Sequence, residues 1–298
     1  MKYIIDTDPG IDDAIAISMA VKNKLDIIGF TVATGNIPVN KVINNIKIIE
    51  DILNINVPIF KGGHENPSSN TAAYAHGVDG LGYAIYPENK SRRVERTYAE
   101  NFIVKAAKKY KDNLTIICLG PLTNIANAIK KDKYLPMRIN KLIMMGTAYD
   151  PQRLTNPYKE FNIRTDPASA KLVLSSKFKD IYAITHEVGL SAYIEKDYIL
   201  NLRTSNDIVS RFIGNISEKY IEFSYQYYGT IGLGTPDPSV IAYVIDPSIF
   251  KFEDFACDVI TSGPDKGICY TTKFQSNIHL STGFNLQKYR NLFKDTFK

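Results

Sequence analysis

Several features that would place this chain in a special class of protein are missing from it. It has three cysteines, Cys118, Cys257 and Cys269, without a Cys-x-x-Cys or Cys/His spacing, which argues against a disulfide framework. No run approaches the roughly 18 apolar residues of a membrane-spanning helix. Lysine and arginine are scattered and leave a net charge of only +5, without the basic stripe interleaved with aromatics that is typical of nucleic-acid binding. Tryptophan is absent.

Linkers, low-complexity tracts and internal repeats are missing as well. The length of 298 residues suffices for one large α/β domain, so we predict a single domain over residues 1–298. The N-terminus enters an apolar strand at once, without a charged leader. We therefore expect a cytoplasmic protein that contacts neither membrane nor nucleic acid.

What the chain does contain is a dense acidic cluster near its start. Asp6, Asp8, Asp12 and Asp13 place four carboxylates within eight residues. The dipole and free N–H groups of a following helix account for one or two of these acids, but not for all of them. Carboxylates packed this closely repel one another unless a cation offsets their charge. Because Ca²⁺ and Mg²⁺ take oxygen ligands of this kind, the cluster predicts a metal site.

Strand and helix signals alternate along most of the chain, which predicts an α/β fold with a mostly parallel central sheet and helices on both faces. We expect strands at 1–6, 25–34, 57–63, 114–119, 141–145, 181–185, 255–261, 267–274 and 277–280, and helices at 12–20, 38–54, 98–110, 122–131, 167–176, 206–228, from about 236, and 286–297. A polar, glycine-rich stretch over 62–89 is too long for a simple connector, and such loops often carry function.

Ligands of open α/β sheets bind outside the carboxyl ends of the strands. In this chain that rule selects Asp6, Asp8, Gly35, Asn36, residues 120–124, Gly146, Thr147, Thr185, His186 and residues 235–237. Acids, amides and hydroxyls dominate this set, and a lysine or arginine that would bind phosphate is missing from it. The predicted ligand is therefore polyhydroxylated and uncharged, or bridged by a metal.

The segment from Asp6 to Ala14, DTDPGIDDA, resembles the N-terminal signature of the inosine-uridine preferring nucleoside hydrolases. Residues 33–36 (ATGN), 76–82 (HGVDGLG), 120–126 (GPLTNIA) and 160–167 (EFNIRTDP) are similar to further segments of that family, in the same order. The resemblance covers about the whole chain. It implies a nucleoside hydrolase-like fold with its active site at the carboxyl ends of the strands, and an enzyme that hydrolyses small ribonucleosides to ribose and a free base.

The resemblance also implies what individual residues do. In that family a Ca²⁺ ion at the floor of the pocket holds the attacking water and the ribose 2′- and 3′-hydroxyls. Carried over to this chain, its ligands are the carboxylates of Asp8, Asp13 and Asp237 and the carbonyl of Thr123, and Asp8 is also the general base. The implied substrate-binding residues are Asp12 and Asn162 for the 2′-hydroxyl, Asp237 for the 3′-hydroxyl, Glu160 for the 5′-hydroxyl, and Asn36 and His76 in the pocket lining. An anionic pocket of this kind stabilises an oxocarbenium-like transition state.

The chain departs from the family pattern at two positions. Pro236 stands where the family has a histidine, proposed as the acid that protonates the leaving base, and Leu154 stands where the family commonly has an asparagine. Asn156 is our candidate for the second contact to the 5′-hydroxyl. The candidates for the leaving-group acid are Tyr225, Tyr228 and His186. The absence of tryptophan removes the indole stacking of one purine-specific branch, so the choice between purine and pyrimidine stays open.

Two alternatives remain at this point. Residues 4–8 also form an apolar strand followed by Asp-x-Asp, as in phosphatases of the haloacid dehalogenase type that would use the Asp6/Asp8 pair, although Gly10 stands where that motif requires threonine or valine. The other alternative is a non-catalytic nucleoside or ribose binder that kept the metal site and lost the acid at Pro236. Members of the nucleoside hydrolase family that the chain resembles are usually homodimers or homotetramers, which implies a homo-oligomer here.

Overall fold

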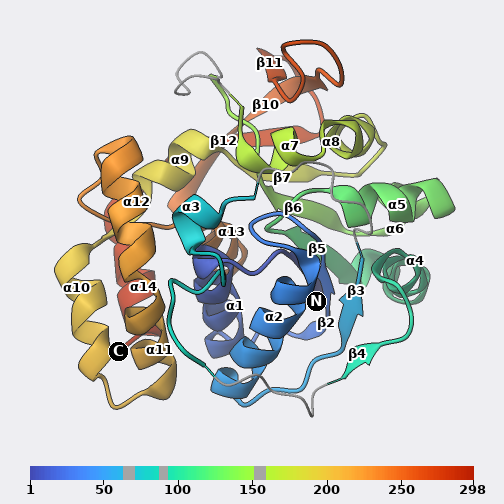
Figure 1. Ribbon diagram of the computed structural model, residues 1–298. Helices are drawn as coiled ribbons and strands as arrows, with labels where there is room; N and C mark the ends of the chain where they lie inside the picture. Colours follow the sequence, from blue (N-terminus) through green and yellow to red (C-terminus); the bar gives the residue numbers. More distant parts are fainter. Residues whose placement is uncertain (63–70, 87–92, 151–158) are drawn as a thin grey trace.

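A ten-stranded sheet runs through the centre of the computed structural model, which describes residues 1–62, 71–86, 93–150 and 159–298 (Figure 1). Its strand order is β11-β10-β12-β7-β6-β5-β1-β2-β3-β4. The strands are β1 (Lys2–Thr7), β2 (Ile27–Val32), β3 (Ile59–Lys61), β4 (Val94–Glu95), β5 (Leu114–Cys118), β6 (Lys141–Met145), β7 (Ile181–Ile184), β10 (Phe250–Val259), β11 (Cys269–Lys273) and β12 (Ile278–Phe284). Neighbouring strands are parallel except at β10, which is antiparallel to both β11 and β12. The predicted mostly parallel sheet is confirmed.

Helices cover both faces of this sheet, as the alternating pattern predicted (Figure 1). One face carries α1 (Ile11–Lys22), α2 (Val39–Leu53), α11 (Ile208–Ile216), α13 (Pro236–Ile245) and α14 (Leu286–Thr296), and the other carries α4 (Ala99–Tyr110), α5 (Thr123–Lys131), α6 (Leu135–Arg138) and α8 (Pro167–Leu174). Successive side chains of a strand point to opposite faces. Ile5 of β1 accordingly belongs to the core under the first set of helices, and Ile4 to the core under the second.

Further elements complete the fold. They are α3 (Ala73–His76), α7 (Phe161–Thr165), α9 (His186–Ser191), α10 (Lys196–Asn201), α12 (Glu218–Tyr228) and the two-stranded sheet of β8 (Tyr193–Glu195) and β9 (Gly232–Gly234). The single helical region predicted over 206–228 is two helices, because the chain breaks at Ser217, whose buried hydroxyl donates to the carbonyl of Ile213. The stretch predicted as a long loop over 62–89 contains α3.

The order of the strands creates a crevice beside β1. The chain passes from β1 outward to β2 and β3, and later returns to place β5 on the other side of β1. The loops that follow β1, β2 and β5 therefore meet at one point of the carboxyl edge, which is where open α/β sheets bind ligands. The acidic cluster that begins at Asp6 lies at this point.

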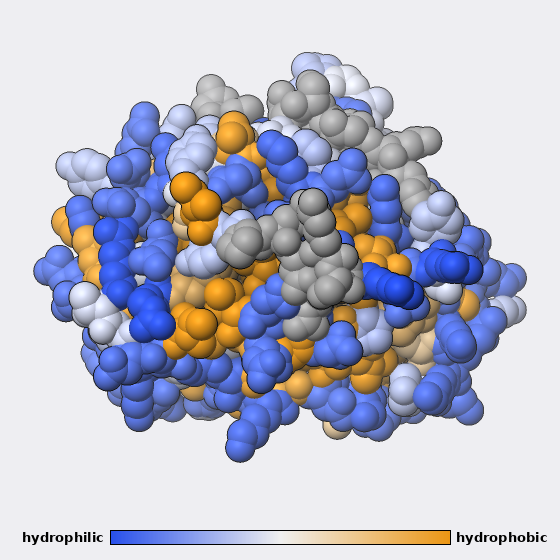
Figure 2. All heavy atoms as spheres, turned by 60° about the horizontal axis from the view of Figure 1, so that its bottom comes forward, coloured by the Kyte–Doolittle hydropathy of each residue, from blue (hydrophilic) through white to orange (hydrophobic). Residues whose placement is uncertain are grey.

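One face of the molecule combines polar and apolar side chains (Figure 2). Figure 2 shows polar side chains over most of the face that it presents, with apolar side chains gathered across its middle. Among the described helices, none combines the length and the apolar composition that a membrane crossing needs.

The C-terminal helix α14 supports the start of α13 through a buried hydroxyl chain. Tyr289 is fully buried, and its hydroxyl donates to Oγ1 of Thr235 at 2.6 Å. Thr235 precedes α13, and both its hydroxyl and its N–H donate to the carbonyl of Ala192. Since Asp237 lies in the first turn of α13, this chain of hydrogen bonds holds an acid of the predicted site in place.

Replacing Tyr289 by phenylalanine tests this support. The change removes one buried donor, so we expect the free energy of unfolding to fall by about 1–2 kcal/mol. Urea denaturation with an unchanged m-value measures it. The matched variant Tyr270→Phe alters a tyrosine that is 53% exposed and should change the free energy by less than about 0.5 kcal/mol. A Tyr289→Phe variant as stable as the wild type would contradict this account.

Candidate active site

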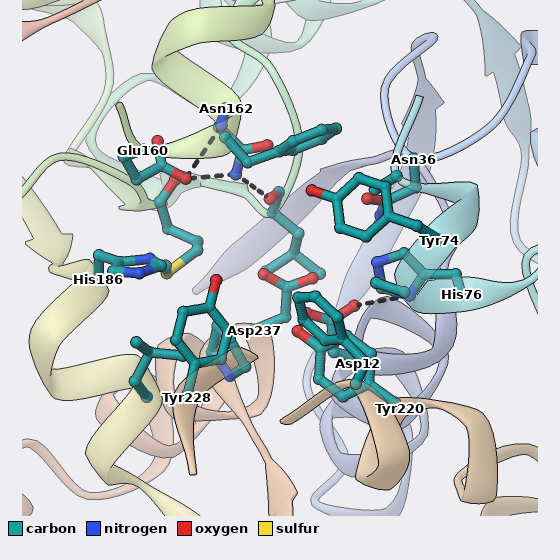
Figure 3. A pocket seen from close by; sticks show the side chains of 18 residues that line it. Asp12, Asn36, Tyr74, His76, Glu160, Asn162, His186, Tyr220, Tyr228 and Asp237 are labelled. Carbon is teal, nitrogen blue, oxygen red and sulfur yellow. Dashed lines mark hydrogen bonds and ion pairs between the residues drawn. The ribbon is translucent and has the colours of Figure 1, made fainter. Parts of the chain in front are cut away.

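A pocket opens at the carboxyl edge of the sheet, where segments distant in the sequence meet (Figure 3). Its lining consists of Asp12, Asn36, Ala72, Tyr74, Ala75, His76, Leu119, Met145, Glu160, Phe161, Asn162, His186, Leu190, Tyr220, Phe223, Tyr228, Pro236 and Asp237. Most of the residues predicted for substrate binding are in this set. Carboxylates and amides form one part of the wall, and aromatic rings form another.

Buried carboxylates without a lysine or arginine partner among the described residues lie at the floor of the pocket and directly beneath it. Asp6, Asp8, Asp12, Asp13 and Asp237 are each at most 6% exposed. Within the described ranges no lysine or arginine forms an ion pair with any of them. Burial raises the pKa of Asp6 to about 7 and that of Asp12 to about 6. Burial, and then the neighbouring aspartates, raise the pKa values of Asp8 and Asp237 well above the usual range, so the floor favours added protons or a metal cation.

The carboxylate of Asp8 lies between the backbones of two loops. Its Oδ2 accepts a hydrogen bond from the N–H of Asn36 at 2.6 Å. A Cβ atom at Gly35 would lie 1.9 Å from Oδ2, and a Cβ atom at Gly120 would lie 2.3 Å from Oδ1. Only glycine leaves room for the acid at these two positions. The loops after β2 and β5 thereby fix the carboxylate that follows β1.

Asp13 is held by several donors. Its Oδ1 accepts from the Thr7 hydroxyl at 2.5 Å, and its Oδ2 accepts from the N–H of Gly10 and from Nδ2 of Asn36, each at 3.0 Å. Asp13 therefore has its charge partly offset and its geometry fixed.

Three acids of the floor could hold a metal ion together. Asp12, Asp13 and Asp237 each offer an oxygen, and these oxygens lie within 4.8 Å of one another. This trio shares Asp13 and Asp237 with the predicted ligand set and contains Asp12 where the prediction has Asp8. A donor set made of carboxylate oxygens fits a hard divalent cation.

Asp6 lies beneath the pocket and ties three elements together. Its Oδ1 accepts from Oγ1 of Thr31 on β2 at 2.5 Å and from Nδ2 of Asn124 on α5 at 2.7 Å. Asn124 follows Thr123, whose hydroxyl donates to Asp166 at 2.7 Å. These contacts hold the first turn of α5, which carries the carbonyl predicted as a metal ligand. Asp6 is not part of the pocket lining, and neither are Asp8 and Asp13.

Glu160 and Asn162 build the side of the pocket opposite the aspartates. Glu160 caps α7, since its carboxylate accepts from the N–H groups of Asn162 and Ile163, each at 2.9 Å. Burial raises its pKa to about 7. Nδ2 of Asn162 donates to the carbonyls of Leu119 and Met145, after β5 and at the end of β6, which leaves the amide oxygen for a substrate hydroxyl. Asn156 lies outside the described residues.

Two histidines line the pocket in neutral form. Nδ1 of His76 accepts from the N–H of Ile11 at 3.1 Å, so the ring proton is on Nε2. Burial lowers the pKa of His76 to about 4 and that of His186 to about 4. The His186 ring packs edge-on against Tyr228 at 5.7 Å. His76 thus fixes the start of α1 and also faces the pocket.

Aromatic side chains close the remaining wall, and the sequence did not assign most of them. The Tyr220 hydroxyl donates to Oδ2 of Asp12 at 3.3 Å, and its ring stacks on His76 at 5.0 Å. Tyr74 and Phe223 are also in the lining, as is the predicted Tyr228. Tyr225 is 65% exposed and lies outside it. The spacing of Tyr220 and Phe223 on one helix face is the signal that could have identified them.

Comparison with known proteins agrees with this geometry. The family described as inosine-uridine preferring nucleoside hydrolase matches residues 3–291. Uridine nucleosidase 1 of Arabidopsis thaliana is 31% identical over 267 residues, which cover 88% of this chain and 79% of that protein. A pyrimidine-specific ribonucleoside hydrolase of Shigella flexneri is 30% identical over 275 residues, 90% of this chain and 85% of that one. The solved structure of a purine-preferring ribonucleoside hydrolase from Gardnerella vaginalis, 26% identical, has a TM-score of 0.91 and covers 100% of this chain and 98% of its own.

Without divalent ions, the stability of the protein should fall as pH rises. The carboxyls of Asp6, Asp12 and Glu160 have folded-state pKa values of about 7, 6 and 7, above their values of roughly 4 in an unfolded chain. Each group contributes stability below its unfolded pKa that is lost as pH rises through its folded pKa. We expect the chelated protein to melt at a lower temperature at about pH 8 than at about pH 5.

Added Ca²⁺ should reverse this trend, because the bound cation offsets the charge that the deprotonated carboxylates of the site carry at high pH. The melting temperature, measured by calorimetry, should rise more at about pH 8 than at about pH 5. Asp112→Asn, which changes an exposed acid paired with Lys179, should respond like the wild type. An equal Ca²⁺ response at both pH values would count against a metal at this floor.

Proposed function

The chain belongs to the inosine-uridine preferring nucleoside hydrolase family, and from this premise we propose how its residues divide the work of the reaction. The enzyme hydrolyses the N-glycosidic bond of ribonucleosides to give ribose and a free base. The observation that carries our assignment is the floor of buried, uncompensated carboxylates beneath an aromatic wall. Fixed negative charge stabilises an oxocarbenium-like transition state. Neither a phosphatase nor a non-catalytic binder is favoured.

We assign the floor to a Ca²⁺ ion, held by the carboxylates of Asp8, Asp13 and Asp237 and the carbonyl of Thr123. The buried oxygen donors and the lack of a basic partner among the described residues support a hard divalent cation. When bound, such an ion lowers the pKa of a water and orients it. Asp13 and Asp237 also belong to the group of oxygens that lie close together in the structure.

Asp8 is our general base. Its Oδ2 is engaged by the N–H of Asn36, which leaves Oδ1 to accept a proton from the attacking water. Burial and the charge of Asp13 raise its pKa well above the usual range, so the carboxylate binds a proton more readily than a free aspartate does. The water oxygen bonds to C1′, its proton passes to Asp8, and the electron pair of the C1′–N bond leaves with the base.

The residues that face the pocket support the ribose contacts that the family resemblance implies. Asp12 and Asp237 line the pocket, whereas Asp8 and Asp13 are not part of its lining. Following the resemblance, we assign Asp12, together with the amide oxygen of Asn162, to the 2′-hydroxyl and Asp237 to the 3′-hydroxyl. Glu160 and the pocket residues Asn36 and His76 complete the set, with Glu160 at the 5′-hydroxyl and Asn156 as a further partner there.

For the base we propose a pyrimidine, with uridine preferred. The names of the two relatives at 30% and 31% identity, a pyrimidine-specific hydrolase and a uridine nucleosidase, support this choice. Tyr228 and His186 bound the part of the pocket that remains for the base. Pro236 is the first residue of α13 and brings no proton donor to it.

We also propose a homodimer or homotetramer in the cytoplasm. The apolar side chains gathered across the face in Figure 2 support self-association, and the three free cysteines fit a reducing compartment. Sedimentation of the purified protein measures its oligomeric state.

Asp8→Asn should reduce turnover of uridine by at least about 10³-fold, because the amide cannot take the proton from water. Reducing sugar released from inosine, adenosine, guanosine, uridine and cytidine measures both the activity and the base preference. An Asp8→Asn variant that keeps most of its activity would rule out the assigned base, and a preference for inosine would rule out the pyrimidine assignment.

Asp12→Asn separates a sugar ligand from a metal ligand. If Asp12 binds the 2′-hydroxyl, the variant should keep its bound Ca²⁺ and raise KM at least about tenfold. Metal content after dialysis and steady-state kinetics give the two readouts. Loss of Ca²⁺ from Asp12→Asn but not from Asp8→Asn would indicate that Asp12, and not Asp8, is the metal ligand.

A further inference from the structure

Tyr74 stands at the mouth of the pocket in a defined position. It lies in α3, which is tied to the loop after β2 by a hydrogen bond from the N–H of Ala72 to the carbonyl of Asn36 at 2.9 Å. Its ring packs against Phe223 at 5.6 Å and Tyr227 at 6.0 Å. The side chain is 47% exposed, yet it lines the pocket, and in Figure 3 its hydroxyl points toward the centre. It therefore contacts both solvent and the space left for the base.

The hydroxyl of Tyr74 has a cation as its partner. Nη2 of Arg164, near the end of α7, donates to the phenol oxygen at 3.3 Å, and the guanidinium lies 5.1 Å from the ring centre of Phe161. A Cβ atom at Gly267 would lie 2.9 Å from Cα of Arg164, so the turn between β10 and β11 packs directly on α7. Arginine can only donate. The phenol oxygen is thus the acceptor, and among the described residues no hydrogen bond uses its own proton.

Other groups on the wall are poorer proton donors toward a leaving base. His186 is neutral, since burial lowers its pKa to about 4. Burial raises the pKa of Tyr228 to about 12, which makes it a weaker acid. The hydroxyl of Tyr220 already donates to Asp12. Tyr74 differs because a guanidinium faces its oxygen and water can reach it.

We propose that Tyr74 protonates the leaving base and that Arg164 is its positioning residue, an inference that rests on the proposed function. As the C1′–N bond breaks, its electron pair passes to the base, and the phenol proton moves to a heteroatom of that base. The guanidinium of Arg164 stabilises the negative charge left on the phenol oxygen. Water then reprotonates Tyr74, and this proton balances the one that Asp8 releases.

Tyr74→Phe tests the proton transfer with two substrates. Its kcat for uridine should fall by about 10²-fold or more, the range of general acid catalysis, with a small change in KM. Cleavage of p-nitrophenyl riboside, whose leaving group needs no proton, should stay within about twofold of the wild type. Arg164→Met should lower the uridine rate by about tenfold. The double variant should be no slower than Tyr74→Phe, because Arg164 acts through the tyrosine.

The matched control is Tyr227→Phe, which keeps the ring beside Tyr74 and removes a hydroxyl that does not line the pocket. It should leave both substrates unchanged. Equal losses on both substrates for Tyr74→Phe would indicate a packing role and overturn the proposal, as would a substrate-selective loss in Tyr228→Phe or His186→Gln but not in Tyr74→Phe. A wild-type enzyme that cleaves neither substrate would overturn the proposed function itself, and the inference with it.

Discussion

Burial of several carboxylates at one edge of the sheet is the constraint on which the rest of this structure depends. Carboxylates in an apolar interior need hydrogen-bond donors, bound protons or a cation to offset their charge. The N–H groups of Gly10 and Asn36 and the hydroxyl of Thr7 serve Asp8 and Asp13. The strand order supplies these donors, because β1 lies between β2 and β5 and the loops of all three meet there. The order of the strands therefore determines which groups stabilise the carboxylates at this edge.

Much of the fold follows from local sequence patterns. The strand over 141–145 matches β6 in full. Apart from α6, which was not predicted, the helices that cover both faces of the sheet begin within about two residues of where apolar periodicity placed them. The elements that periodicity did not identify are short and depend on distant contacts. The four-residue helix α3 is anchored by the carbonyl of Asn36, and α7 begins where Glu160 caps it. Such helices are set by tertiary contacts, which a local pattern does not contain.

In the active site, too, local motifs identified some residues, and others depend on tertiary contacts. The acids and amides were identifiable because they lie in continuous motifs after strands, and the structure brings Asp12, Asn36, Glu160, Asn162 and Asp237 into one pocket. Apart from Tyr228, the aromatic wall was not assigned, because its members come from α3 and α12, and no local feature shows that these helices face each other. Which aspartates can share a metal also depends on side-chain directions, and these bring oxygens of Asp12, Asp13 and Asp237 within 4.8 Å of one another.

The two glycines that flank Asp8 have a consequence for the length of the acid between them. With hydrogen atoms in place of Cβ, Gly35 and Gly120 leave a slot that is filled by a carboxylate one methylene from the backbone. The longer side chain of a glutamate would bring its carboxylate into contact with the main chain of these two loops. Aspartate and glutamate are therefore not interchangeable here despite equal charge and similar acidity. The position of the Asp8 carboxylate is thus set by the main chain of two neighbouring loops rather than by the reach of a flexible side chain.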